Sequence, residues 1–184
     1  MENDSELIDG CKSGSDSAFE KLYQKYASKM KGVAYRYVND ADIAEDIIQE
    51  AFVKVFVNIK SFDASRSFEG WLHRVVVNAA IDQFHKSKKK LENIADLKYL
   101  TETDNDDAPE DNHEYSMEEL LESIGMLPEG YKMVFNMYVI DNFSHKEIAA
   151  ALNITEGTSK SQLSKAREYL KKILEKYKTV SDAR

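Results

Sequence analysis

The sequence predicts an all-α protein with two small helical domains joined by an acidic flexible linker, the C-terminal domain containing a helix-turn-helix. Apolar residues recur at spacings of three and four along most of the chain, as one face of a helix requires. Only 7 of the 184 residues are glycine and 2 are proline, and no alternating run of strand residues is bounded by turn signals. A chain of this length holds one ordinary domain or two small ones of under about 100 residues each.

The uneven distribution of charge favours two domains. The net charge is −8, but residues 1–90 are neutral, residues 91–127 carry −11 and residues 128–184 carry +3. Almost all the excess acid therefore lies between two neutral or basic parts, and we predict domains at 1–90 and 115–184 with a linker at 91–114. Nucleic-acid binding depends on local phosphate neutralisation, so an acidic chain remains a candidate.

The acidic stretch from Thr101 to Glu114 has no periodic apolar residues and contains Pro109. Such a segment repels itself and cannot bury a core, so we expect it to be mostly disordered. Its simplest role is a tether. A sharper hypothesis is that its carboxylates mimic nucleic acid and compete for a basic channel on a partner. The carboxylates are those of Asp104, Asp106, Asp107, Glu110, Asp111 and Glu114.

The N-terminal ninety residues predict three or four helices. Asp16 or Ser17 would cap a long helix that ends near Asn39, because side-chain oxygens accept from free amides at a helix start and asparagine tolerates the left-handed conformation at its end. The following helix has a complete apolar stripe at helical spacing. This stripe consists of Ile43, Ile47, Ile48, Ala51, Phe52, Val55, Phe56 and Ile59.

Two valines of that second helix, Val53 and Val57, lie outside its apolar stripe. Isolated surface valines are common and often carry no function. The alternative is that they belong to a partner surface, because they share their face with polar side chains. These are Asp46, Gln49, Glu50 and Lys54.

A polar loop at residues 61–67 precedes a helix from about Phe68 to Lys90. Trp71, Arg74 and Asn78 lie near one side of this helix, and its far end is basic, with Lys86, Lys88, Lys89 and Lys90. An aromatic ring, an amide and lysines on one helix suit single-stranded nucleic acid, where rings stack on bases and lysines follow phosphates. Trp71 by itself is more readily a core residue.

The C-terminal domain begins with a capping box, in which Ser116 and Glu119 satisfy each other's amides at the start of a helix. Pro128 suits the first turn of the next helix. The apolar side predicted for that helix consists of Tyr131, Val134, Phe135, Tyr138 and Val139.

Residues 143–174 predict the helix-turn-helix. Ser144 and Glu147 repeat the capping box, Asn153 suits a helix end, and Thr155 can cap the helix that follows. That helix buries one stripe, formed by Leu163, Ala166, Leu170, Ile173 and Leu174. Its opposite side offers Lys160, Ser161, Ser164, Lys165 and Arg167. Such a face suits the major groove, although a charged outer face is common in any helical hairpin. Ser159 replaces the aliphatic residue usual between the two helices, which predicts looser packing.

Other chemistries have little support in the sequence. Cys11 is the single cysteine, which excludes an intramolecular disulfide and favours a reducing compartment. The four histidines, His73, His85, His113 and His145, lack metal-ligand spacing, and no glycine-rich phosphate loop occurs. We therefore predict no enzyme, cofactor, metal or small-molecule substrate. With no signal peptide and no run of about 18 apolar residues, we expect a cytoplasmic protein without direct membrane insertion.

Three segments in order resemble the extracytoplasmic-function sigma factors, the compact two-domain initiation subunits of bacterial RNA polymerase. Residues 42–52 (DIAEDIIQEAF) look like the family's polymerase-binding helix. Residues 68–78 (FEGWLHRVVVN) look like its promoter-melting segment, and residues 156–167 (EGTSKSQLSKAR) are similar to its upstream-promoter reading helix. The resemblance covers nearly the whole chain and implies binding to core RNA polymerase and promoter DNA.

The resemblance implies three roles. The residues that would dock on the coiled-coil clamp helices of core polymerase are Asp46, Gln49, Glu50, Val53 and Val57. Those for the minus-10 element, with the loop at 61–67 capturing an unstacked base, are Trp71, Arg74, Asn78, Lys86, Lys88, Lys89 and Lys90. In the minus-35 element, base edges would meet Lys160, Ser161 and Ser164, and phosphates would meet Thr158, Gln162, Lys165 and Arg167. An anti-sigma factor is a further implied partner.

Departures from the family pattern at Ser159, Gln162 and Ser164 prevent any transfer of base preferences. A transcriptional regulator that binds operators without polymerase is the competing interpretation. It is mildly disfavoured because the N-terminal domain lacks an evident ligand cavity and carries its own basic, aromatic face.

Overall fold

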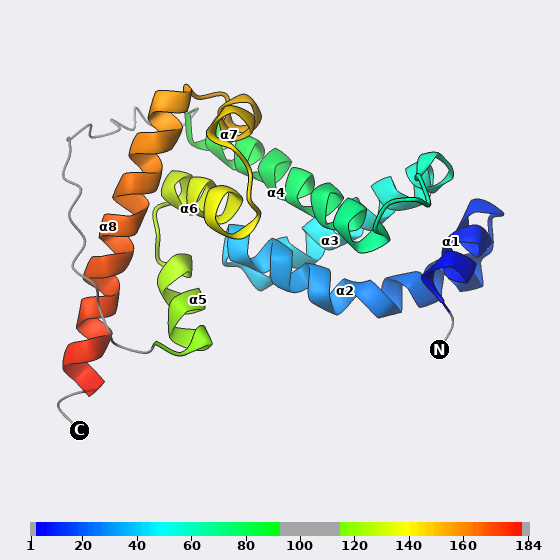
Figure 1. Ribbon diagram of the computed structural model, residues 1–184, viewed down its shortest axis with the longest axis horizontal. Coiled ribbons are helices and arrows are strands. Elements are labelled where there is room, and N and C mark those ends of the chain that lie inside the picture. Colours follow the sequence, from blue (N-terminus) through cyan, green and yellow to red (C-terminus); the bar gives the residue numbers. More distant parts are fainter. Residues whose placement is uncertain (1–2, 93–114, 182–184) are drawn as a thin grey trace. The chain divides into compact units, whose positions relative to one another are not determined.

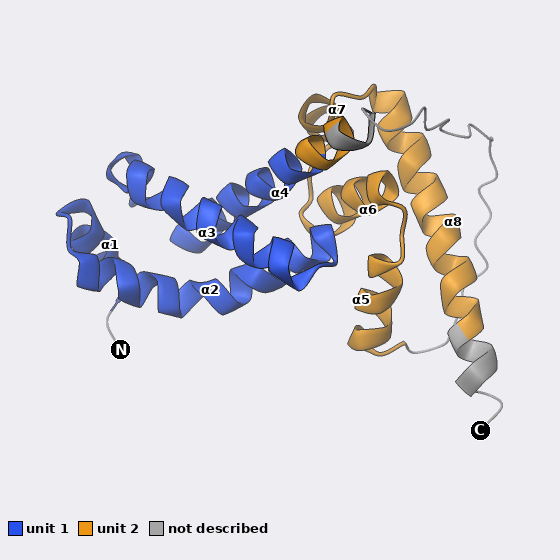
Figure 2. Cartoon of the chain, turned by 180° about the vertical axis from the view of Figure 1, so that it is seen from behind, with its two compact units in different colours: residues 1–84 blue, residues 85–184 orange. Residues whose placement is uncertain are grey.

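Every regular element in the computed structural model is a helix within the residues that it describes, which are 3–92 and 115–181 (Figure 1). Side chains are described for residues 3–89 and 115–176. The chain divides into two compact units, residues 1–84 and 85–184 (Figure 2). The predicted linker at 91–114 lies almost entirely outside the described residues. The described part agrees with the predicted all-α class.

The first unit contains α1 (Asp4–Lys12), α2 (Asp16–Val38), α3 (Ala41–Asn58), the short 3-10 helix η1 (Ile59–Ser61) and the start of α4 (Phe68–Glu92), which crosses the division between the units. Its core is formed by side chains that are almost completely inaccessible. Among them are Leu22, Met30 and Tyr37 of α2, Ile48 and Val55 of α3, and Leu72 and Val76 of α4.

Local hydrogen bonds fix the ends of α2 and α3. The predicted cap of α2 at Asp16 or Ser17 is wrong, because Ser15 precedes the helix in an extended conformation and its hydroxyl accepts from the Ala18 amide at 3.3 Å. Asn39 ends α2 as predicted, with a φ of 52°. Asp40 then starts α3 by accepting from the amides of Asp42 and Ile43, each at 2.9 Å.

The predicted stripe of α3 is wrong at Phe56, whose side chain is 46% exposed. At about 100° per residue, Phe56 lies about 120° around the helix from the buried Ala44, at the edge of the core face. Its ring packs edge-on against Phe19 of α2, with the centroids 4.8 Å apart. The α2–α3 contact therefore continues outward from the core as an accessible aromatic surface.

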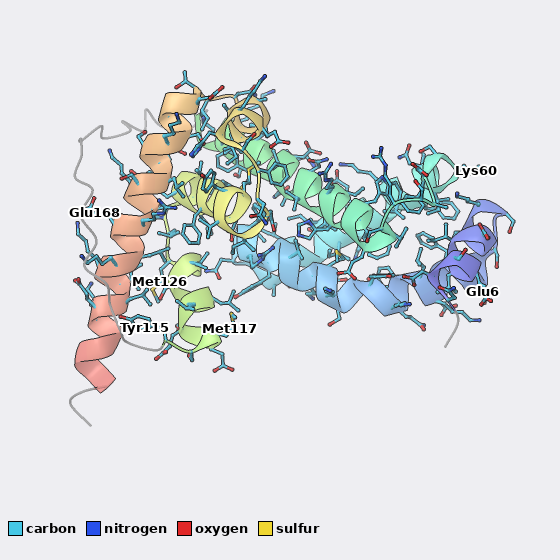
Figure 3. The ribbon with its side chains drawn as sticks, in the orientation of Figure 1. Glu6, Lys60, Tyr115, Met117, Met126 and Glu168 are labelled. Atoms are coloured by element: carbon cyan, nitrogen blue, oxygen red, sulfur yellow. The ribbon has the colours of Figure 1, made fainter. Side chains whose placement is uncertain are left out.

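The second unit contains α5 (Met117–Gly125), α6 (Glu129–Phe135), the π-helix η2 (Asn136–Ile140), α7 (His145–Leu152) and α8 (Glu156–Ser181). Both predicted capping boxes are confirmed, at Ser116 with Glu119 and at Ser144 with Glu147. Pro128 immediately precedes α6. Met117 and Met126, at the two ends of α5, remain exposed (Figure 3).

The predicted apolar side of the α6 segment is wrong beyond Val134. Tyr138 and Val139 are exposed, whereas Met133 and Met137 are buried. A π-turn lies in the same segment, where the Asp141 amide donates to the Asn136 carbonyl at 3.0 Å across five residues. Met133 and Met137 are four residues apart, so the buried side keeps helical spacing and the predicted stripe lay too far around the helix.

Lys132 of α6 is buried, although lysine side chains are rarely buried in proteins. Its Nζ donates to the carbonyl of Gly125 at 3.2 Å, at the end of α5. This bond supplies a partner for a carbonyl that the helix itself leaves unsatisfied. Burial lowers the pKa of the Lys132 ammonium.

Candidate nucleic-acid and partner interfaces

The outward face of α3 is the first candidate interface. Val53 is 63% exposed and Val57 is 71% exposed, at about 180° and about 140° around the helix from Ala44. Asp46 and Gln49 of the same face are exposed and Glu50 is half-buried. The five predicted residues therefore lie outside the core and on one side of α3, with two valines among polar groups.

An apolar groove between α2 and α3 adjoins this face and was missed by the sequence analysis. It has a volume of about 580 Å³. Phe19, Tyr23, Phe52, Val53, Phe56, Asp16 and Gln49 line it. The aromatic rings of the groove pack against one another. The Phe52 ring packs edge-on against Tyr23, with centroids 4.7 Å apart, and against Phe19, with centroids 6.3 Å apart. The signal in the sequence was that Phe56 lies at the edge of the α3 stripe, where a large ring is only partly covered.

Ion pairs tie this face to the neighbouring helices. Lys31 of α2 and Glu45 of α3 pair at 2.6 Å, and the hydrogen bond between them lowers the pKa of Glu45 and raises that of Lys31. The Nζ of Lys54 lies 3.0 Å from a carboxylate oxygen of both Glu50 and Asp82. The α3 face is therefore held in register with α2 and with α4.

The second candidate interface is the loop before α4 together with the first turns of that helix. Phe62 of the loop is buried, and its ring centroid lies 5.1 Å from that of the half-buried Trp71 and 5.5 Å from that of Phe68. Arg74 and Asn78 are exposed one and two turns beyond Trp71. The structure thus gives Trp71 an aromatic backing and leaves Arg74 and Asn78 open to solvent.

The loop is shaped by its own side chains. Asp63 accepts from the amide of Ser65 at 3.0 Å and from its hydroxyl at 2.8 Å, and these bonds lower the pKa of Asp63. Ser67 caps α4 by accepting from the Gly70 amide at 3.2 Å. The backbone of this polar loop therefore has a defined course.

The predicted lysine cluster at residues 86–90 belongs to the second compact unit. Lys86, Lys88 and Lys89 lie in the last turns of α4, in the second unit, with Lys86 and Lys89 exposed and Lys88 half-buried. The side chain of Lys90 lies outside the described residues. The cluster is thus assigned to a different unit from Trp71, Arg74 and Asn78.

The third candidate interface is the start of α8. Asn153 ends α7 with a φ of 54°, and Thr155 caps α8 by accepting from the Thr158 amide at 3.0 Å, both as predicted. Four of the predicted side chains are exposed, namely Lys160, Ser161, Ser164 and Arg167. The other three, Thr158, Gln162 and Lys165, are half-buried.

Ser159, where the sequence predicted looser packing, is completely buried. Its hydroxyl shares a hydrogen bond of 2.9 Å with Nδ1 of His145, the first residue of α7. The His145 ring also stacks on Tyr138, with centroids 4.4 Å apart and planes 19° apart. A polar pair replaces the expected aliphatic contact and joins the two helices of the hairpin.

Comparison with known proteins assigns the chain to a family. Residues 22–90 match Sigma-70 region 2, and residues 117–170 match Sigma-70 region 4. The ECF RNA polymerase sigma factor SigW of Bacillus subtilis is 33% identical over 172 residues, which covers 89% of this chain and 92% of the relative. The chain belongs to the extracytoplasmic-function sigma factors. It is therefore a transcription initiation factor.

Further similarities agree with this assignment. The ECF RNA polymerase sigma-E factor of Haemophilus influenzae is 28% identical to this sigma factor over 176 residues, 91% of this chain and 93% of the relative. The structure of the sigma factor RpoE in complex with the anti-sigma factor NepR, from Bartonella quintana, matches with a TM-score of 0.51 and 19% identity. That match covers 85% of this chain and 96% of the other, and it shows the fold.

Parts of this sigma factor lie outside the two matched regions. The whole of α1 precedes residue 22, and α8 continues beyond residue 170 to Ser181. In the described part of the chain, no group of three or more His, Cys, Asp and Glu side chains is arranged to hold a metal ion, and no helix is both long and apolar enough to span a membrane.

Proposed function

We propose that this sigma factor docks on core RNA polymerase through the outward face of α3. Asp46, Gln49, Glu50, Val53 and Val57 form the contact, and the groove beside Phe56 extends it. Two exposed valines next to an aromatic groove supply the apolar centre that a specific interface buries, and the carboxylates supply its polar rim. The observation that carries this assignment is the exposure of Val53 and Val57 on a helix whose other apolar residues are mostly buried.

The start of α8 reads the minus-35 element in this proposal. Lys160, Ser161 and Ser164 meet base edges in the major groove, where each base pair has a distinct pattern of donors and acceptors. Arg167, Lys165, Thr158 and Gln162 hold phosphates and thereby fix the register of the helix. The exposure of Lys160, Ser161, Ser164 and Arg167 supports a DNA contact at the start of α8, since a side chain must be accessible to reach the groove or the phosphates.

The loop at 61–67 and the first turns of α4 open the minus-10 element in this proposal. Trp71, Arg74 and Asn78 hold an unstacked base, while Lys86, Lys88, Lys89 and Lys90 neutralise the neighbouring duplex. Extruding a base costs a few kcal/mol, and stacking of about 1–3 kcal/mol for each base can offset that cost. The aromatic backing of Trp71 by Phe62 supports this role, because a fixed ring loses little entropy on stacking.

An anti-sigma factor is the proposed inhibitor. It would cover the α3 face or the groove when polymerase is absent, since an accessible apolar surface of this kind is a common protein contact site. The site of action is the cytoplasm, where bacterial RNA polymerase works. The protein acts through binding, without catalytic chemistry of its own.

The decisive test combines the purified protein with bacterial core RNA polymerase and a genomic fragment library. We expect co-elution of the two and transcription from new, position-specific starts. Absence of polymerase binding together with tight and specific binding to DNA alone would instead support a regulator. Weak binding of free DNA by the isolated protein is compatible with the proposal, because polymerase raises the effective concentration of both DNA readers.

Replacement of Lys160 by alanine tests the minus-35 assignment. We expect holoenzyme with Lys160→Ala to lose about 10-fold in affinity for its preferred minus-35 element and much less for scrambled DNA, since a good base contact contributes about 1–3 kcal/mol. Competition binding with the two duplexes at fixed salt measures the difference. Equal loss on both duplexes would assign Lys160 to phosphate alone.

A further inference from the structure

The N-terminal helix α1 lies outside the Sigma-70 region 2 match, yet it is firmly attached to the first unit. Leu7, Ile8 and Cys11 are buried along one side of it. At its start, Asp4 accepts from the Tyr26 hydroxyl at 2.6 Å and pairs with Lys25 at 2.5 Å. These hydrogen bonds lower the pKa of Asp4. The Asp4 carboxylate therefore anchors the start of α1 to α2.

Close packing fixes the other end of α1 against α2. A methyl group placed on Gly10 would lie 2.7 Å from the Cβ of Ala18, a distance that real contacts do not reach. Gly10 therefore allows α1 to approach α2 closely and sets the position of the residues that follow it. Lys12, the last residue of α1, is one of them.

Lys12 reaches from α1 to the loop before α4. Its Nζ donates to the carbonyl oxygen of Phe62 at 2.9 Å and lies 5.8 Å from the centroid of the Phe62 ring. The same ring packs against Trp71 and Phe68. The ammonium thus holds both the backbone and the ring of the residue that supports Trp71.

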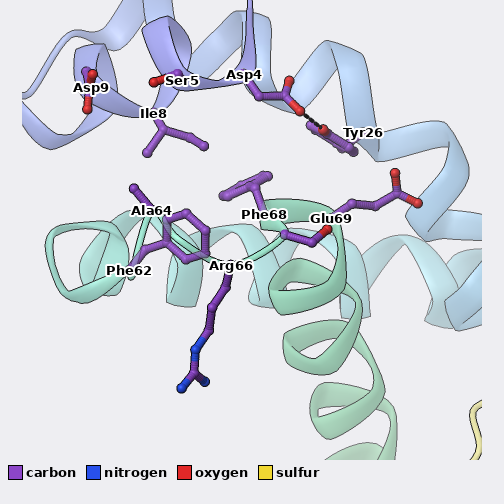
Figure 4. Close-up of a pocket in the computed structure, with 11 residues that line it drawn as sticks. Asp4, Ser5, Ile8, Asp9, Tyr26, Phe62, Ala64, Arg66, Phe68 and Glu69 are labelled. Carbon is purple, nitrogen blue, oxygen red and sulfur yellow. Dashed lines mark hydrogen bonds between the residues drawn. The ribbon is translucent and has the colours of Figure 1, made fainter.

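Beyond this tie, α1 and the loop are separated by a cavity of about 290 Å³. Figure 4 shows Asp4, Ser5, Ile8 and Asp9 along α1 facing the segment that carries Phe62, Ala64 and Phe68. The side of the loop that faces α1 borders open space there, so the Lys12 hydrogen bond is a direct tie across a gap between α1 and the loop. The bond is charge-assisted, and such bonds are stronger than those between neutral groups.

We propose that Lys12 is a positioning residue for promoter opening, which holds the loop at 61–67 and the Trp71 ring in the arrangement that captures a minus-10 base. The inference rests on the proposed role of that loop. Lys12 contacts Phe62, which supports Trp71, and in this proposal Lys12 itself does not touch DNA. The helix α1, outside the matched region, is thereby part of the opening machinery.

The test compares Lys12→Met, which keeps much of the side-chain volume but removes the donor, with Lys12→Arg, which keeps a charged donor. Lys60→Met is the matched control, because Lys60 is an exposed lysine two residues before Phe62 (Figure 3). Full-length variants are assembled with core polymerase, and opening is followed by the fluorescence of 2-aminopurine in the minus-10 element. Thermal unfolding, polymerase co-elution and the salt dependence of promoter binding are measured in parallel.

We expect Lys12→Met to lower the equilibrium for opening about tenfold, equivalent to about 1.4 kcal/mol, with polymerase binding and thermal unfolding unchanged. Lys12→Arg should recover most of the opening, and Lys60→Met should stay within about twofold of the parent. A plot of log promoter affinity against log salt concentration should keep its slope in Lys12→Met. A side chain that does not contact phosphate releases no counterions when DNA binds.

Normal opening by Lys12→Met would overturn the inference, provided that Trp71→Ala loses opening in the same assay. A smaller salt slope would also overturn it, by assigning Lys12 to phosphate, and so would a general loss of stability and polymerase binding, by assigning it to folding. If Trp71→Ala and Lys12→Met both open the promoter normally, the minus-10 role of the loop is itself wrong. The Trp71→Ala result thus separates failure of the inference from failure of the proposed function.

Discussion

A Val53→Glu variant is expected to bind core RNA polymerase at least about 100-fold more weakly than the parent, with little change in folding. Val53 is 63% exposed and points away from the core of its unit, so glutamate is tolerated there in the free protein. In the complex, the new carboxylate would lie among apolar groups without a partner. An uncompensated buried charge costs about 3–5 kcal/mol, and a 100-fold loss needs only about 2.7 kcal/mol.

Titration of labelled variant against core polymerase measures this loss, and urea unfolding measures stability. Ser28→Glu is the matched control, because it adds the same charge at an exposed position of α2 in the same unit. We expect Ser28→Glu to bind like the parent. Parental affinity in Val53→Glu would remove the α3 face from the polymerase contact, and equal weakening in both variants would indicate a general effect of charge.

The features that could be predicted from the sequence are those decided within one helical turn. The capping boxes at Ser116 and Ser144 are confirmed because each pairs a hydroxyl with a carboxylate three residues away. Asn39 and Asn153 end their helices as predicted because asparagine tolerates positive φ. These interactions involve neighbours in the chain, so residue type and spacing determine them.

The features that could not be predicted depend on which side of a helix meets the core or on distant partners. Tyr138 and Val139 follow a helical pattern, but the buried side of this helix is centred on Met133 and Met137, and spacing alone does not decide which of two overlapping apolar stripes faces the core. Ser159 pairs with His145 across 14 residues, which a pattern of apolar spacing does not reveal. Three or four helices were predicted in the N-terminal domain, but none was located at Asp4–Lys12, because the charged residues of this short segment leave only a narrow apolar side.

The candidate interfaces were easier to predict than the surfaces beside them. Val53 and Val57 stood out as apolar residues off the core stripe, and both are exposed. The groove next to them was missed, since the edge position of Phe56 indicates only a partly covered ring and the groove also requires Phe19 of α2 to meet it. The partner of each face remains a prediction, because exposure describes which groups are accessible and not what they bind.

Removal of the His145 imidazole is expected to weaken minus-35 binding about tenfold and to lower the free energy of unfolding of the full chain by about 1–3 kcal/mol. The His145→Ala change leaves the Ser159 hydroxyl completely buried without its hydrogen-bond partner, and an unsatisfied buried group carries a penalty of that size. Ser159 immediately precedes Lys160 and Ser161 in α8. Any backbone shift that gives the Ser159 hydroxyl a new hydrogen-bond partner therefore also moves Lys160 and Ser161, the two side chains proposed to contact bases.

A double-mutant cycle isolates the contribution of this hydrogen bond. In His145→Ala with Ser159→Ala the buried hydroxyl is absent, so the double variant should be more stable than the sum of the two single losses predicts. Urea unfolding and competition binding of the assembled holoenzyme to minus-35 duplexes measure both effects. Lys146→Ala, at the exposed neighbouring position of α7, should unfold like the parent. Losses that add to within about 0.5 kcal/mol would show that His145 and Ser159 are not coupled, and the α7–α8 arrangement would then depend on Tyr138 stacking and apolar packing alone.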